Sequence, residues 1–157
     1  MKIKVLAIGK TDDKCLNELI GQYEKRLKHY IPFELDIIPD LKQVKNMSMT
    51  EQKSKEGQLF LKKLKPTDFI VLLDEKGKDF RSIEFADYLQ KRMNSGIKQL
   101  VLLIGGPYGF SPEIYEKAQG KISLSKMTFS HQMIRLFIIE QIYRSFTILK
   151  NEPYHHE

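Results

Sequence analysis

The fold is decided by the stretch Leu100-Val101-Leu102-Leu103-Ile104-Gly105-Gly106-Pro107-Tyr108-Gly109, which continues through Leu124-Ser125-Lys126-Met127-Thr128-Phe129 to Arg135. A continuous apolar run such as residues 100–104 is typical of a parallel strand that is covered on both faces. Loops that follow strands of this kind meet at one edge of the sheet, which is where α/β proteins bind their ligands. We therefore expect the glycine cluster and the segment 124–129 to form a ligand site together.

Apolar runs and helical patterns alternate along the rest of the chain. The runs predict strands at residues 3–8, 33–38, 69–73, 100–104 and 121–125, and the helical patterns predict helices at residues 13–30, 50–64, 82–94, 111–120 and 130–150. This alternation predicts an α/β fold with a mostly parallel sheet and helices on both faces. A chain of 157 residues can bury one sizeable core, so we expect a single domain over residues 1–157.

Some segments carry more detailed expectations. Residues 33–38 alternate between apolar and polar side chains, which predicts a half-buried strand near an edge of the sheet. Residues 74–78 are expected to be a solvated turn after the third strand. Because the carboxyl ends of parallel strands share one edge, Asp74, Gly105 and Ser125 are expected to converge.

The charge of the chain is compatible with a polyanionic partner. The formal net charge is +6 at pH 7, with 14 Lys and Arg against 9 Asp and Glu in residues 1–65, but 12 against 11 in residues 66–157. A basic front half is typical of proteins that bind nucleic acid. A lysine-rich solvated surface explains the same numbers, so both interpretations stay open.

Several other classes of protein are excluded or disfavoured by short patterns. The lone Cys15 excludes an intramolecular disulfide, and the His, Cys and Asp residues show no spacing typical of a metal site, so we expect no metal. The segment Gly9-Lys10-Thr11 lacks the upstream glycine of a phosphate-binding loop. No run approaches the roughly 20 apolar residues that cross a membrane. We expect a cytoplasmic protein without membrane association.

The last predicted helix, residues 130–150, has apolar side chains on more than one stripe. A helix on the surface of a globular protein needs only one apolar stripe, of about 100°. The additional apolar face predicts a homodimer, with a deeply buried central helix as the alternative.

The cluster Gly105-Gly106-Pro107-Tyr108-Gly109 does not have the spacing of a dinucleotide-binding loop. Adjacent glycines nevertheless allow a ligand to approach the backbone closely. A plain turn between a strand and a helix is the alternative.

These segments, taken together, resemble a known family. The similarity rests on the glycine cluster 105–109, on Leu124-Ser125-Lys126-Met127-Thr128-Phe129-Ser130-His131-Gln132-Met133-Ile134-Arg135, on Glu140-Gln141-Ile142-Tyr143-Arg144 and on the terminal Pro153-Tyr154-His155. The chain is similar in these segments to the ribosomal RNA large subunit methyltransferase H family of the SPOUT class. The resemblance extends over the whole chain, including Gly9-Lys10 and Lys55-Glu56-Gly57. It implies methylation of N3 of a pseudouridine in large-subunit ribosomal RNA.

The resemblance also implies a fold, a methyl donor and partners. The fold would contain a C-terminal trefoil knot, which pattern reasoning alone would reject because knots are rare. The donor would be S-adenosylmethionine in a pocket made by the knotted loops, and the active site would form at the interface of a homodimer. The donor contacts that the resemblance implies are Leu73, Gly105, Leu124, Ser125, Lys126, Met127, Thr128 and Phe129.

Methylation of an imide nitrogen requires a group that accepts or stabilises its proton. His131 is the first candidate, because a helix N-terminus disfavours a positive charge and keeps a neutral ring able to accept a proton; capping or orienting the last helix is the alternative. Arg135 and Arg144 are expected to hold phosphates or the charge that develops on the ring. Arg144 alternatively pairs with Glu140 at i, i+4.

The end of the chain matches the family signature, with two departures elsewhere. Tyr154 and His155 are expected to act in catalysis by stacking on a base. A frayed tail is the alternative. Ser130 stands where the family usually has proline, which changes little because serine caps helices well. His156 stands where the family commonly has Arg or Lys, which weakens any role for a fixed charge at that position.

Two rival functions stay open at this point. One is a ribosome- or RNA-binding accessory domain that keeps the fold and lacks activity, and would therefore not bind the donor. The other is a SPOUT methyltransferase that acts on transfer RNA. The small size of the chain favours a large, preformed target such as the ribosome.

Overall fold

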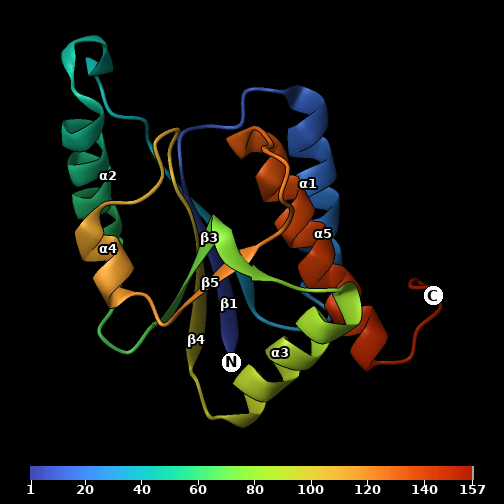
Figure 1. Cartoon of the computed structure of the whole chain (residues 1–157). Helices are drawn as coiled ribbons and strands as arrows, with labels where there is room; N and C mark the ends of the chain where they lie inside the picture. Colours follow the sequence, from blue (N-terminus) through green and yellow to red (C-terminus); the bar gives the residue numbers. More distant parts are fainter. Residues whose placement is uncertain (157) are drawn as a thin grey trace.

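Five parallel strands form one sheet in the computed structural model, which describes residues 1–156 (Figure 1). The strands are β1 (Lys2–Ile8), β2 (Phe33–Ile38), β3 (Phe69–Asp79), β4 (Gln99–Ile104) and β5 (Gly120–Ser123). Their order across the sheet is β2-β1-β4-β3-β5, and each neighbouring pair is parallel. The predicted α/β fold is confirmed, and β2 lies at an edge as its alternating pattern predicts.

Helices cover both faces of the sheet (Figure 1). One face carries α1 (Lys14–Leu27), α3 (Ser82–Asn94) and α5 (His131–Leu149), and the other carries α2 (Met49–Lys63) and α4 (Pro112–Lys117). A 3-10 helix, Val44–Asn46, precedes α2. Among residues 1–156, no helix combines the length and the hydropathy needed to span a membrane.

The central strand β4 is buried on both of its faces. Leu100, Leu102 and Ile104 pack in the hydrophobic cluster formed with α1, α3 and α5, whereas Val101 and Leu103 pack in the cluster formed with α2 and α4. None of the five is more than 4% exposed. Two-sided burial explains why this strand is apolar at every position instead of at every second one.

The helix α5 lies between α1 and α3 (Figure 1). Ile138, Ile139 and Ile142 are fully buried and share one hydrophobic cluster with residues of both neighbouring helices. Met133, Phe137 and Ile148 are only half-buried. Packing within the chain therefore accounts for part of the apolar pattern, and the homodimer stays a prediction.

Residues 74–78, which were expected to form a turn, belong to β3 instead. Leu73 lies opposite Ile122 of β5, and after an irregular segment Lys78 lies opposite the same residue. Gly77 passes so close to β5 that a Cβ at this position would lie 2.5 Å from the backbone nitrogen and carbonyl carbon of Ile122. This pairing joins distant parts of the chain, so a local pattern of charged residues and glycine could not indicate it.

The boundaries of other elements differ by a few residues from those expected. The helix expected to be capped by Thr50 begins at Met49, because the Ser48 hydroxyl accepts a hydrogen bond from the backbone N–H of Glu51 at 3.1 Å. The last strand ends at Ser123 and not at Ser125. Such shifts are ordinary for helix and strand ends.

We predict opposite effects for two glycine-to-alanine substitutions. Gly77→Ala should lower the free energy of unfolding by about 1–3 kcal/mol, because the added methyl group overpacks the contact between β3 and β5. Gly21→Ala in α1 should raise the free energy of unfolding by about 0.5–1 kcal/mol, because alanine favours the helix and no atom lies within 4 Å of the added Cβ. Urea unfolding of both variants measures this, and equal shifts would show that position 77 is not constrained by β5.

Candidate functional site

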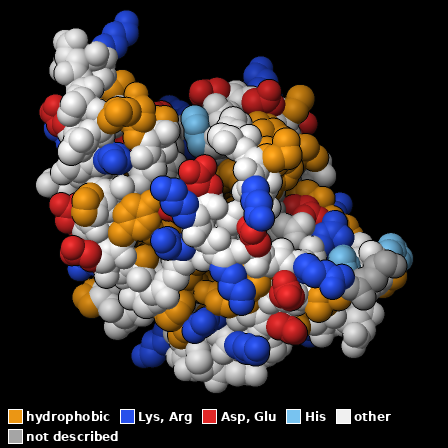
Figure 2. All heavy atoms as spheres, viewed as in Figure 1, with side chains coloured by type: hydrophobic (Ala, Val, Ile, Leu, Met, Phe, Trp, Pro, Cys, Tyr) orange, Lys and Arg blue, Asp and Glu red, His pale blue; other side chains and the backbone are white. Residues whose placement is uncertain are grey.

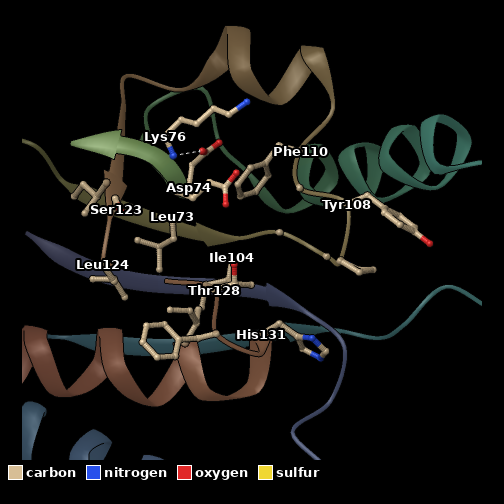
Figure 3. A pocket seen from close by; sticks show the side chains of 18 of the residues that line it. Leu73, Asp74, Lys76, Ile104, Tyr108, Phe110, Ser123, Leu124, Thr128 and His131 are labelled. Carbon is tan, nitrogen blue, oxygen red and sulfur yellow. Dashed lines mark hydrogen bonds between the residues drawn. The ribbon is translucent and has the colours of Figure 1, made fainter. Parts of the chain in front are cut away.

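A cavity of about 730 Å³ opens at the carboxyl edge of the sheet, within the range typical of small-molecule sites (Figure 3). It lies between residues 73–76 of β3, the loop after β4 and the loop between β5 and α5. Asp74, Gly105 and Ser125 all line it, so the predicted convergence of these three residues is confirmed. Leu73 and Ile104 form part of its apolar wall (Figure 3).

The first wall is the glycine cluster, residues 105–109. The backbone N–H of Gly109 donates to the carbonyl of Gly106 at 3.1 Å, and Gly109 has a φ of +78°, which favours glycine. A Cβ on Gly105 would lie 3.3 Å from the carbonyl group of Gly109. The cluster is therefore a tight turn that presents mostly backbone to the cavity.

The second wall is the loop between β5 and α5. The Ser125 hydroxyl accepts from the backbone N–H of Met127 at 2.9 Å, and the Phe129 ring packs on Phe137 of α5 with centroids 5.0 Å apart. The Ser130 hydroxyl caps α5 by accepting from the N–H of Met133 at 3.2 Å. The loop is thereby joined to the helix, and it still leaves the Met127 side chain 73% exposed.

The residues expected to contact a methyl donor are mostly on this cavity. Seven of them line it, and Lys126 lies in the same loop with an exposed side chain but does not line it. The seven are Leu73, Gly105, Leu124, Ser125, Met127, Thr128 and Phe129. The cavity also has lining residues that sequence reasoning missed, among them Lys53 and Tyr115.

Asp74 lies in the irregular segment of β3, after Leu73, and two hydrogen bonds hold it in place. One carboxylate oxygen accepts from the backbone N–H of Lys76 at 2.8 Å, and the other accepts from the Tyr115 hydroxyl of α4. Burial, together with the hydrogen bond to Asp74, raises the pKa of Tyr115 to about 12. Tyr115 could not be found from sequence, because α4 approaches β3 only in the folded chain.

His131 is the first residue of α5 and lies at the cavity, with an exposed ring (Figure 3). Its backbone follows the Ser130 cap directly, so the cap positions it. Of the five residues expected to act in catalysis, His131 alone lines the cavity within the described chain.

Arg135 lies one turn further along α5 and is completely buried. Its guanidinium donates to the carbonyl of Ile8 at 2.7 Å and to the hydroxyl of Thr11 at 2.8 Å. A third link joins the same two segments, because the side chain of Gln132 accepts from the backbone N–H of Asp12 at 3.0 Å. Burial lowers the pKa of Arg135, whereas the negative charges of Asp40 and Asp12 act to raise it. Arg135 thus ties the loop after β1 to the start of α5 from inside the protein.

Arg144, Tyr154 and His155 form a separate cluster near the C-terminal end of α5. Glu140 accepts from Arg144 Nη2 at 2.6 Å and from the Tyr154 hydroxyl at 3.1 Å, so the alternative i, i+4 pair of Arg144 is formed. The Tyr154 hydroxyl also lies 3.0 Å from that of Tyr23 in α1, and the Arg144 guanidinium lies 4.7 Å from the Tyr154 ring centroid. His155 Nδ1 lies 3.4 Å from Arg144 Nη1.

This cluster fixes the tail but keeps it away from the cavity of its own chain. Burial, with the hydrogen bonds to Tyr23 and Glu140, raises the pKa of Tyr154. Residues 131 and 144 are separated by roughly 20 Å along a helix that rises about 1.5 Å per residue. The five candidate residues therefore do not form one site within a single chain.

The comparisons with known proteins decide the family. A family model described as "Predicted SPOUT methyltransferase" matches residues 1–155. This chain belongs to the SPOUT methyltransferase family. Proteins named ribosomal RNA large subunit methyltransferase H are 66% identical to it in Flavobacterium psychrophilum and in Flavobacterium johnsoniae, and 62% identical in Parabacteroides distasonis, in each case over 157 residues and 100% of both chains.

Membership of the SPOUT methyltransferases gives the cavity a chemical meaning. The family implies a methyl donor, and it implies the C-terminal knot that the resemblance predicted. In residues 1–156 of this SPOUT methyltransferase, no three His, Cys, Asp or Glu side chains are grouped to hold a metal ion. The residues that line the cavity are the candidates for holding the donor.

We predict that Arg135 stabilises this SPOUT methyltransferase. Arg135→Ala should lower the free energy of unfolding by about 3–5 kcal/mol, because it leaves a cavity and removes two charge-assisted hydrogen bonds. Thr11→Val removes one of them and should cost only about 1 kcal/mol. Denaturant unfolding checks both values. An Arg135→Ala variant as stable as the unmodified protein would contradict the inward role of this side chain.

Proposed function

We propose that this SPOUT methyltransferase transfers a methyl group from S-adenosylmethionine to N3 of a pseudouridine in large-subunit ribosomal RNA, as a homodimer on the assembled ribosome. The observation that carries the proposal is the cavity between the glycine cluster and the loop 124–130, with His131 beside it, in a chain 66% identical over its full length to proteins named for ribosomal RNA methylation. Its further support comes from the chemistry of the walls.

The cavity walls fit such a donor. S-adenosylmethionine combines a flat adenine ring with a polar ribose, a positively charged sulfonium and a charged amino-acid end. The cavity offers apolar side chains from Leu73, Ile104 and Leu124, and backbone groups from the Gly105–Gly109 turn. Apolar walls with a few placed polar groups are what small-molecule sites require.

The bound donor would supply an electrophilic methyl group on a sulfonium. The chain's own contribution is then to align the accepting ring nitrogen with it and to exclude water. His131 is exposed beside the cavity, where a neutral imidazole can take the imide proton. Arg135 fixes this part of α5 through its hydrogen bonds to the Ile8 carbonyl and the Thr11 hydroxyl.

A second subunit would complete the site. Arg144 and His155 lie at the other end of α5 from His131, so one chain cannot bring all three to one target base. In a two-fold dimer, the cluster of one subunit can face the cavity of the other. Exposed apolar side chains beside the cavity, Met127 and Phe129, supply surface for such an interface.

Exposed lysines near the same edge favour an RNA target. Figure 2 shows Lys and Arg side chains over the middle of the viewed face, where Figure 1 places β3 and β5. Lys76, Lys78, Lys121 and Lys126 are exposed in these strands and in the loop that follows β5. Phosphate contacts from such side chains dominate affinity for nucleic acids. Transfer RNA as the target, and an inactive RNA-binding domain, are the rival functions.

We predict that the unmodified protein binds S-adenosylmethionine and has the mass of a dimer in solution. Isothermal titration calorimetry and light scattering measure the two properties. The rival accessory domain would bind ribosomal RNA without binding the donor. Absence of donor binding by a folded protein would therefore contradict the proposed activity.

We predict that variants at the two ends of α5 complement each other. His131→Ala and Arg144→Ala should each abolish methyl transfer to ribosomes isolated from cells that lack the modification. After subunit exchange, half of the dimers would be mixed and each would contain one intact composite site, so about a quarter of the activity should return.

The same mixture distinguishes the alternatives. If each site used residues of one chain only, mixed dimers would contain no intact site and no activity would return. Transfer of labelled methyl groups to transfer RNA, and not to ribosomes, would favour the transfer RNA methyltransferase.

A further inference from the structure

The helix α2 contacts the glycine cluster through Glu56, to which the proposed reaction gives no role. α2 and α4 lie side by side on one face of the sheet, and the glycine cluster leads from β4 into α4 (Figure 1). Glu56 is only 3% exposed. Burying a carboxylate costs free energy unless the group is neutral or paired, so the surroundings of Glu56 must meet one of these conditions.

The carboxyl group of Glu56 lies directly against the α-carbon of Gly106. A Cβ on Gly106 would lie 2.3 Å from Glu56 Oε2 and 2.7 Å from Oε1, so an alanine here would force the buried Glu56 carboxyl group to move. Gly106 does not have a positive φ, so the close approach of Glu56, and not backbone conformation, favours glycine here.

Glu56 is held in this position by its own helix. Its Oε1 accepts from the side-chain amide of Gln52 at 2.8 Å, one turn earlier. Its Oε2 is buried and has no hydrogen-bond partner within residues 1–156. Burial raises the pKa of Glu56 and the negative charge of Asp40 adds to this, while the hydrogen bond from Gln52 opposes it. The neutral acid is thus favoured relative to an exposed glutamate.

Gly57, the next residue of α2, makes a second close contact, in which the glycine belongs to α2 and the side chain to the segment before α4. A Cβ on Gly57 would lie 2.3 Å from the hydroxyl oxygen of Ser111, which is 1% exposed and precedes α4. Phe60, one turn after Glu56, packs on Phe110 with ring centroids 6.0 Å apart. One face of α2 therefore contacts the chain near the start of the glycine turn and again just after its end.

We propose that Glu56 is a positioning residue for the donor cavity: its carboxyl group sets the position of Gly106 and so holds the Gly105–Gly109 turn in the shape that binds the methyl donor. The part of this inference that concerns the donor rests on the proposed function. Glu56 does not line the cavity itself, so it acts through the turn.

A cycle of substitutions tests the contact. Glu56→Ala should speed amide hydrogen exchange across residues 104–110 and weaken S-adenosylmethionine binding about tenfold, because the turn loses its support. Gly106→Ala should weaken binding by a similar factor, because the new methyl group meets Glu56. The double variant should bind within about threefold of Glu56→Ala alone, since the clash is then absent.

Two further variants separate shape from charge and from helix stability. Glu56→Gln keeps the shape of the neutral acid and should restore donor affinity to within about threefold of the unmodified protein. Gln58→Ala changes an exposed residue of the same helix and should alter neither exchange nor affinity. Melting temperatures of all variants show which changes come from global unfolding.

The outcomes are distinct. Fully additive effects of Glu56→Ala and Gly106→Ala, or a Glu56→Gln variant as defective as Glu56→Ala, would overturn the inference. So would a Glu56→Ala variant that melts earlier but binds the donor normally. If the unmodified protein itself does not bind the donor, the proposed function fails, and hydrogen exchange still tests whether Glu56 supports the turn.

Discussion

The pairing of β4 with β1 on one side and with β3 on the other determines where every part of the site lies. Helices cover both faces of β4, so its side chains are buried. The first groups of this segment that a ligand can reach are therefore those of the glycine cluster, which follows the strand. The loop after β1 and residues 73–76 of β3 must then flank the glycine turn. Arg135 joins one of these flanks to α5, and Tyr115 joins the other to α4.

Local patterns were sufficient wherever burial is continuous or a cap is made by a neighbouring residue. The strand 100–104 follows from its apolar run, and the start of α5 follows from Ser130. Patterns failed where a distant segment decides the conformation. The extension of β3 depends on Gly77 fitting over Ile122, which no window around residue 77 contains.

The candidate site shows the same division. Position-by-position resemblance identified seven residues that line the cavity, whereas Lys53 and Tyr115 lie there only because helices from elsewhere approach the edge of the sheet. Arg135 stands in an apolar stretch of α5, between Ile134 and Leu136, although an arginine normally faces solvent. Only the fold reveals that it is buried against Ile8 and Thr11.

The helix α5 runs without interruption from His131 beside the cavity to the cluster around Arg144. Inserting or deleting one residue between them would turn the cluster by about 100° and displace it by about 1.5 Å along the axis. Tyr154, which donates a hydrogen bond to Glu140, would then no longer meet Tyr23 of α1. The number of residues between the two ends of this helix should therefore be constant during evolution, even where the individual side chains between them change.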